Sequence, residues 1–186
     1  MRSFLLPIAL LLGPIAGAAG TGTDTVALPA KTTLDMALVS SINEKQTGEQ
    51  EITFKLMREL KVQGQVLAPK GTAVTGRVTR IEKGSAFVHS VKRNYFVVGV
   101  SLSTLDLDDK RIPVTGNLEI LGPTGMQADY FVPYSHGPDK WGELADYRFA
   151  FKVPPPRPGE SFFGVVREGL GVPKGLRMVF RTPDTE

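Results

Sequence analysis

The chain has 186 residues, enough for one domain with a short appendage. Hydrophobic residues make up 41% and charged residues 22%, so the chain can bury a core and does not have the composition of a disordered protein. No cysteine and only two histidines are present, which excludes disulfides and thiolate sites and disfavours a histidine-rich metal site. The net charge of +3 is too small to predict nucleic-acid binding. We therefore expect no cofactor, no metal and no nucleic acid.

The first 20 residues have the pattern of a secretory signal peptide. Arg2 is the only charged residue before Asp24, an apolar run covers 4–12, and small residues at 16–18 suit a signal peptidase. An uncleaved anchor is the alternative, but the run is shorter than the roughly 20 residues that span a bilayer. The sequence predicts a signal peptide over 1–20 and an exported chain, periplasmic or secreted, with no membrane span after cleavage.

After the signal segment, apolar and polar residues alternate in short runs separated by glycine and proline, which is typical of half-buried antiparallel strands. The segment 51–60 also fits a helix through Ile52, Leu56 and Leu60, but Thr53 and Phe54 favour a strand. A change of parity between 98 and 107 predicts a long strand with a bulge. The apolar positions of the expected strands are Leu34, Met36 and Leu38; Ile52, Phe54 and Leu56; Val74 and Val78; Val98, Val100, Leu102, Leu105 and Leu107; Ile112, Val114, Leu118 and Ile120; and Met178 and Phe180.

A short motif precedes three of the alternating runs. It reads Pro-Ala-Lys at 29–31 and Pro-Lys-Gly at 69–71 and again at 173–175. Proline suits a turn because its φ is fixed, and the glycine two residues later can take the left-handed conformation that a bulged hairpin needs. The motif predicts tight connections between strands.

The segment 122–160 is rich in proline and differs from the rest of the chain. Nine of the 15 aromatic residues lie between positions 130 and 163. Because a disordered linker is poor in aromatics, we expect an ordered, irregular excursion. Aromatic faces stack on sugars or grip peptides, so Tyr130, Tyr134, Trp141 and Tyr147 are candidate partner-binding residues. A lid packed over one end of a barrel is the alternative.

The densest basic region contains Lys92 and Arg93, with Arg77, Arg80 and Lys83 nearby in the sequence. Cations next to an aromatic residue can bind single-stranded nucleic acid, but an exported protein would meet an anionic polymer or a lipid headgroup instead. Lys92 and Arg93 are therefore candidate partner-binding residues. The alternative is that these cations only keep strand faces solvated.

Catalytic and metal-binding patterns are weak. Asp106, Asp108 and Asp109 are clustered but lack the glycine and distal glutamate of a calcium loop, so we interpret them as a hairpin turn. His89 and His136 are not part of a Gly-x-Ser-x-Gly motif, and a catalytic triad is assembled from separate elements. We expect no enzymatic activity.

One local group keeps an enzyme among the alternatives. Asp139, Glu143 and Asp146 lie close to Trp141 in the sequence. Two carboxylates that converge in a cleft could hydrolyse a cell-wall polymer or another polysaccharide.

Three segments, 28–32, 38–42 and 66–78, resemble the β-barrel domain of the VirB10/TrbI family. That family runs P-x-G-T … L … I-x-S … I-P-x-G-S-x-x-x-G, and Lys31 stands where it has its first glycine. The resemblance covers about residues 26–120. The family is non-enzymatic and belongs to the envelope-spanning scaffold of type IV secretion and conjugation machines, so the resemblance implies a barrel with a scaffold role.

Together these patterns predict one all-β domain over 21–186, a small antiparallel barrel or sandwich with an aromatic- and proline-rich excursion near its C-terminal end. The expected function is that of an exported, non-catalytic structural or binding module of the bacterial cell envelope. Its partner would be an envelope protein or a cell-surface polymer. A component of a secretion or conjugation assembly and a polysaccharide hydrolase are the alternatives.

Overall fold

The computed structural model describes residues 28–46, 49–88, 90–122, 130–131 and 157–184. These residues form β-strands and no helix, so the predicted all-β fold is confirmed. The strands are β1 (Thr33–Leu38), β2 (Ile42–Asn43), β3 (Gln50–Leu56), β4 (Leu60–Val62), β5 (Gln65–Ala68), β6 (Ala73–Val88), β7 (Val91–Asp106), β8 (Arg111–Pro113), β9 (Asn117–Gly122), β10 (Tyr130–Phe131), β11 (Ser161–Val165), β12 (Gly171–Val172) and β13 (Arg177–Arg181).

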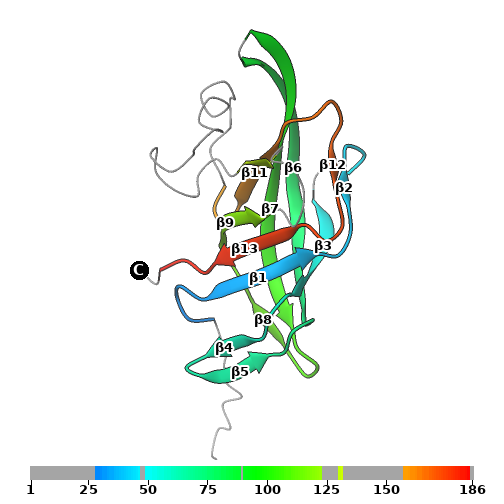
Figure 1. The fold of residues 1–186 in the computed structure, drawn as a ribbon. Coiled ribbons are helices and arrows are strands. Elements are labelled where there is room, and N and C mark those ends of the chain that lie inside the picture. The colour runs from blue at the N-terminus through cyan, green and yellow to red at the C-terminus, as the bar shows by residue number, and fades with distance from the viewer. Residues whose placement is uncertain (1–27, 47–48, 89, 123–129, 132–156, 185–186) are drawn as a thin grey trace, which may run out of the picture.

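Nine strands form one antiparallel sheet that curls into a half-barrel (Figure 1). The order is β10-β11-β7-β6-β3-β1-β13-β9, and β8 pairs with β7 off this path. Two small sheets, β12–β2 and β4–β5, lie outside it. The chain between β8 and β9 links the two sides of the curl, because β8 pairs with β7 whereas β9 pairs with β13.

The core fills the concave side of the curled sheet. Period-two alternation turns every second side chain inward, and these positions are the aliphatic and aromatic ones that the sequence marks. The rings of Phe54 and Phe180 meet edge to face, with centroids 6.0 Å apart. Of the predicted strand 51–60, the part up to Leu56 belongs to β3, with Ile52, Phe54 and Leu56 buried, whereas 57–59 is not strand and Leu60 begins β4.

Extra residues at three places shift the register of the sheet and bend it. Ser103 is the extra residue of β7, which confirms the predicted bulge, and Thr79 is the extra residue of β6. Glu119 is the extra residue of β9. Because of this third bulge, Ile120 faces outward and is 47% exposed, so the prediction that it shares the inward face of Leu118 is wrong.

The three turn motifs adopt one geometry. Lys31, Gly71 and Gly175 have φ of 60°, 91° and 86°. The backbone N–H of each of these residues donates to a carbonyl at or just beyond the end of a strand of the main sheet. The pairs are Lys31 to Thr182, Gly71 to Leu56 and Gly175 to Leu38, at 2.8–3.2 Å. The tight connections are thus confirmed. However, the strands they join, β5 to β6 and β12 to β13, belong to different sheets, so the turns do not close hairpins.

The acidic cluster is a hairpin turn, as predicted. Asp106 at the end of β7 pairs with Arg111 at the start of β8, and the Leu107 N–H donates to the Lys110 carbonyl at 2.9 Å. Asp108 and Asp109 therefore lie at the tip of the turn.

Most of the predicted excursion 122–160 and the whole predicted signal segment 1–20 lie outside the described residues, so both stay predictions. Within the described part of the chain, no helix has the length and apolar character needed to cross a membrane.

Candidate functional site

The longest element of the fold is the hairpin of β6 and β7, whose strands have 16 residues each. Near the core it is flanked by β3, which pairs with β6 as far as Val78, and by β11, which pairs with β7 as far as Phe96. Residues 83–96, of which only Phe96 still pairs with β11, extend past these pairs and project from the half-barrel (Figure 1). We refer to residues 83–96 as the arm.

The cross-strand register of the arm sorts its side chains onto two faces. Phe87 lies opposite Lys92 on one face, and Ala86 lies opposite Arg93 on the other. Lys92 and Arg93, both predicted from the sequence as partner-binding residues, are exposed there. Phe87 is 71% exposed and Val91 is 49% exposed, so the end of the arm also carries unburied apolar surface.

A glycine and a tyrosine stiffen the middle of the arm. Gly84 lies opposite Tyr95, and the Tyr95 ring occupies the space where a Cβ on residue 84 would stand. Tyr95 is buried, although it lies on the outward face of the hairpin. An aromatic ring that covers a cross-strand glycine restores the packing that the missing side chain would have supplied.

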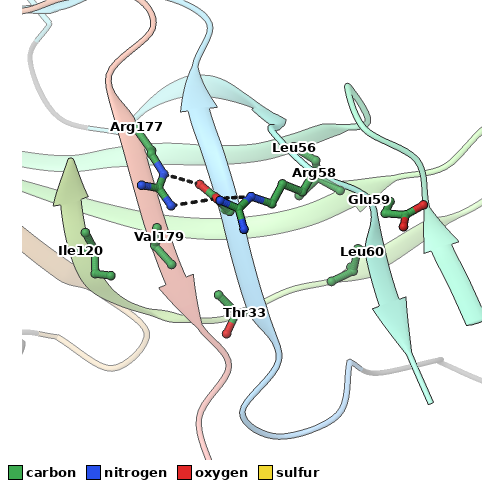
Figure 2. Close-up of a pocket in the computed structure, with 9 residues that line it drawn as sticks. Thr33, Leu56, Arg58, Glu59, Leu60, Ile120, Arg177 and Val179 are labelled. Carbon is green, nitrogen blue, oxygen red and sulfur yellow. Dashed lines mark hydrogen bonds and ion pairs between the residues drawn. The ribbon is translucent and has the colours of Figure 1, made fainter. Parts of the chain in front are cut away.

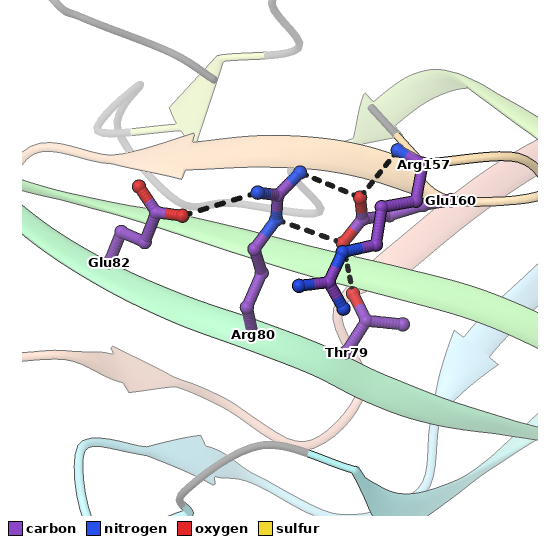
Figure 3. A network of polar contacts seen from close by, with 5 residues as sticks. All are labelled: Thr79, Arg80, Glu82, Arg157 and Glu160. Atoms are coloured by element: carbon purple, nitrogen blue, oxygen red, sulfur yellow. Dashed lines mark hydrogen bonds and ion pairs between the residues drawn. The ribbon is translucent and has the colours of Figure 1, made fainter. Parts of the chain in front are cut away.

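A polar network fixes the base of the arm to β11 (Figure 3). The Glu160 carboxylate accepts hydrogen bonds from Arg80 Nε at 3.0 Å and Arg80 Nη2 at 2.8 Å, so the two side chains form a bidentate pair. The carboxylate also accepts from the Thr79 hydroxyl and, at 2.8 Å, from the Arg157 backbone N–H. Arg80 in turn contacts Glu82 at 3.3 Å.

Two local features of the sequence make this network possible. The bulge at Thr79 places the Thr79 hydroxyl beside the Arg80 guanidinium, and both meet Glu160. Gly99 faces them from β7, where a Cβ would overlap the Glu160 carboxylate and the Thr79 hydroxyl. Burial alone would raise the pKa of Glu160, but the hydrogen bonds from Thr79, Arg157 and Arg80 and the charge of Arg80 outweigh it, so the pKa is lowered.

A shallow hollow of about 380 Å³ lies beside this base, between the arm and the loop after β2. Ile81 and Phe96 contribute apolar surface to it, and Glu44 faces them from the loop. The Lys83 ammonium lies 5.2 Å from the centre of the Phe96 ring, a distance at which a cation is attracted to the ring face. The hollow therefore continues the apolar and cationic character of the arm toward the core.

A second hollow, of about 320 Å³, lies on the outer face of β1 and β13 (Figure 2). At its centre Asp35 accepts from Arg177 Nε at 2.7 Å and Nη2 at 2.9 Å, and Arg58 Nε lies 3.2 Å from the same carboxylate. The hydrogen bonds from Arg177 lower the pKa of Asp35. Burial opposes this shift, and the charges of Arg177 and Arg58 reinforce it. Asp35 raises the pKa of Arg177. These groups satisfy one another and clamp β1, β13 and the segment before β4 together.

The remaining candidates are only partly placed. Tyr130 belongs to β10, where it pairs with Val165, which pairs with Phe96, so its backbone lies beside the base of the arm. Tyr134, Trp141 and Tyr147 lie outside the described residues, as do His89, His136 and the acidic group of 139–146. Among the residues that are described, no three histidine or acidic side chains are grouped so that they could hold a metal ion.

Sequence reasoning missed Phe87, Val91 and the Glu160 network. The arm has no turn glycine between its strands, so the hairpin leaves no strong sequence signal. Glu160 is 80 residues from Arg80, and only the fold brings the two together.

No protein-family model matches the chain, and a search of the curated proteins found no match either.

Proposed function

We propose that this protein is an exported, non-catalytic structural or binding module of the bacterial cell envelope, related in architecture to the VirB10/TrbI barrel, and that the arm is the element that contacts its partner. One observation carries the proposal. The arm extends past the rest of the described sheet and ends in exposed apolar and cationic side chains, Phe87, Val91, Lys92 and Arg93. Exposed apolar side chains that gather at the end of a projecting element favour a surface that meets a partner.

The anchoring of the arm supports this reading. The Glu160–Arg80 pair, the bulge at Thr79 and the Tyr95 ring over Gly84 hold the hairpin in one direction relative to the half-barrel. A preorganised contact element binds with less loss of conformational entropy than a flexible loop. The half-barrel then serves as a frame that presents the arm.

The test is an affinity pull-down from a bacterial envelope extract, with protein that lacks residues 1–20. The arm variant combines Phe87→Ser with Lys92→Ser, an apolar residue and a cation that face each other across the hairpin. The β4–β5 hairpin offers a matched control, because Lys61 lies opposite Val66, which is 52% exposed. We expect capture of the same envelope partner by the wild type and by the control Val66→Ser with Lys61→Ser, and loss of capture with the arm variant.

Equal capture by all three proteins would overturn the role of the arm. The N-terminal sequence of protein recovered from cells tests export separately, and an intact residue 1–20 segment on protein that stays in the cytoplasm would contradict it.

A further inference from the structure

We infer that the end of the arm binds the surface of an anionic phospholipid bilayer, with Phe87 and Val91 entering the boundary of the acyl chains and Lys92 and Arg93 contacting phosphate groups. The inference rests on the proposed function and names the partner of the same site. It starts from four side chains whose exposure and register are known.

Apolar side chains lie nearest the turn of the hairpin, and the first cation lies level with Phe87. Val91 belongs to the pair nearest the turn, Phe87 and Lys92 form the next pair, and Arg93 lies in the one after that. Each pair is about 3.4 Å further from the turn, so the cations begin within about 7 Å of the tip. Apolar groups of interfacial elements enter a bilayer by roughly 5–10 Å, so the long Lys92 side chain, level with Phe87, reaches back to the headgroups, and Arg93 starts one pair further out.

Apolar side chains on both faces favour a bilayer over a protein groove. Phe87 lies on one face of the hairpin and Val91 on the other, and both are exposed. A groove on a protein surface usually reads one face of a strand, whereas a fluid acyl layer surrounds an inserted tip from every side. The exposed ring also sets lipid apart from a purely anionic polymer, which would need the cations but not Phe87.

The charge of the arm is complementary to an anionic surface. Between positions 83 and 96 the sequence holds Lys83, Lys92 and Arg93 and no acidic residue. Each cation near an anionic leaflet strengthens binding by about 1 kcal/mol, or about fivefold. Two exposed cations therefore add an electrostatic attraction to the burial of the apolar tip.

Sedimentation with lipid vesicles tests the inference. We expect wild-type protein to bind vesicles of equal parts phosphatidylcholine and phosphatidylglycerol and to bind phosphatidylcholine vesicles at least tenfold more weakly, with binding that falls as salt rises. Phe87→Ser should weaken binding to the anionic vesicles by about tenfold or more, since an apolar side chain of this size is no longer buried. The Val66→Ser control should bind as the wild type does.

A dye at the tip reports insertion directly. The chain has no cysteine, so Ser90→Cys gives one labelling site in the turn, and Val66→Cys gives a matched site on β5. An environment-sensitive fluorophore should brighten and shift to the blue with anionic vesicles at position 90 and stay unchanged at position 66.

Two results would overturn the lipid inference. One is that the protein binds both kinds of vesicle equally, or binds neither, while the arm variant still fails to capture the envelope partner. This result would leave the proposed function intact and assign the arm to a protein partner. The other is that Phe87→Ser binds soluble poly-glutamate as strongly as the wild type does and that the dye does not respond to vesicles. This result would assign the arm to an anionic polymer. Equal capture from the envelope extract by the wild type and the arm variant would instead count against the proposed function.

Discussion

Glu160 is the residue whose chemistry depends most on its surroundings. Its carboxylate is almost buried, yet four donor groups keep it ionised by lowering its pKa below the ordinary 4.5. Neighbouring residues could have predicted part of this site, because Arg157-Pro158-Gly159-Glu160 reads as a turn that returns a backbone N–H to the acidic side chain. Its pairing with Arg80 could not be predicted, because the contact arises only when β11 docks on β7.

Replacing the Glu160 carboxylate should make the free energy of unfolding depend less on pH in the acidic range. A folded-state pKa below the unfolded value means that ionised Glu160 stabilises the fold above about pH 4.5 and that this contribution disappears as the pH falls through the lower, folded-state pKa. We expect Glu160→Gln to lower the free energy of unfolding by about 1–2 kcal/mol at neutral pH.

Urea unfolding at neutral pH and again below pH 4.5 measures this effect. The gap between wild type and Glu160→Gln should narrow in acid, and a gap that stays constant would contradict the argument. Glu82→Gln is the control, because Glu82 contacts the same arginine from a half-exposed position and should change stability by less than about 0.5 kcal/mol.

At the scale of elements, alternation predicted most of the sheet because every second residue must face a shared core. Leu34, Met36 and Leu38 show this in β1, and Met178 and Phe180 show it in β13. The alternation fails at Ile120, where the extra residue Glu119 reverses the direction of the side chains without any marker in the sequence. The end of the arm was missed because its side chains are exposed on both faces, so no shared core imposes an alternating pattern on them.

The repeated turn allows a paired test of backbone strain. Lys31 holds a positive φ that Gly71 and Gly175 hold at the equivalent turn positions, and a Cβ on Gly175 would meet no atom within 4 Å. At this turn position, glycine and a residue with a side chain therefore differ in stability only by the conformational cost of a side chain on a left-handed backbone.

We expect Lys31→Gly to raise the free energy of unfolding by about 0.5 kcal/mol and Gly175→Ala to lower it by about 1 kcal/mol. The ion pair that Lys31 loses with Asp184 is exposed and contributes little. Chemical denaturation measures both changes, and shifts of the same sign would show that the turns are not equivalent.

At the scale of the whole molecule, one side chain ties the two sides of the curled sheet together. Ser161 at the start of β11 accepts a hydrogen bond from the Leu118 N–H of β9 at 2.9 Å and donates to the Gly116 carbonyl at 3.3 Å. The strand pairing alone leaves β9 and β11 unpaired with each other, so this buried hydroxyl takes the place of strand-to-strand bonds.

Ser161→Ala should therefore cost more than a typical surface change. It leaves the buried Leu118 N–H without its acceptor, and we expect a loss of about 1–3 kcal/mol in the free energy of unfolding. Thermal and urea unfolding measure the loss, with exposed Ser85→Ala on the arm as the control. A Ser161→Ala protein as stable as the wild type would mean that the curl closes by packing alone.

The pairing of β1 with β13 has a consequence for the order in which the chain folds. Thr33 lies opposite Arg181, so the earliest and latest strands described are neighbours, and β13 also separates β1 from β9. In a polypeptide that emerges N-terminus first, β1 and β9 therefore join one sheet only after β13, the last described strand, has been made, and such distant pairings form slowly. Strands β3, β6 and β7 pair with one another without β13, so the side of the sheet that holds β9 is the last to be completed.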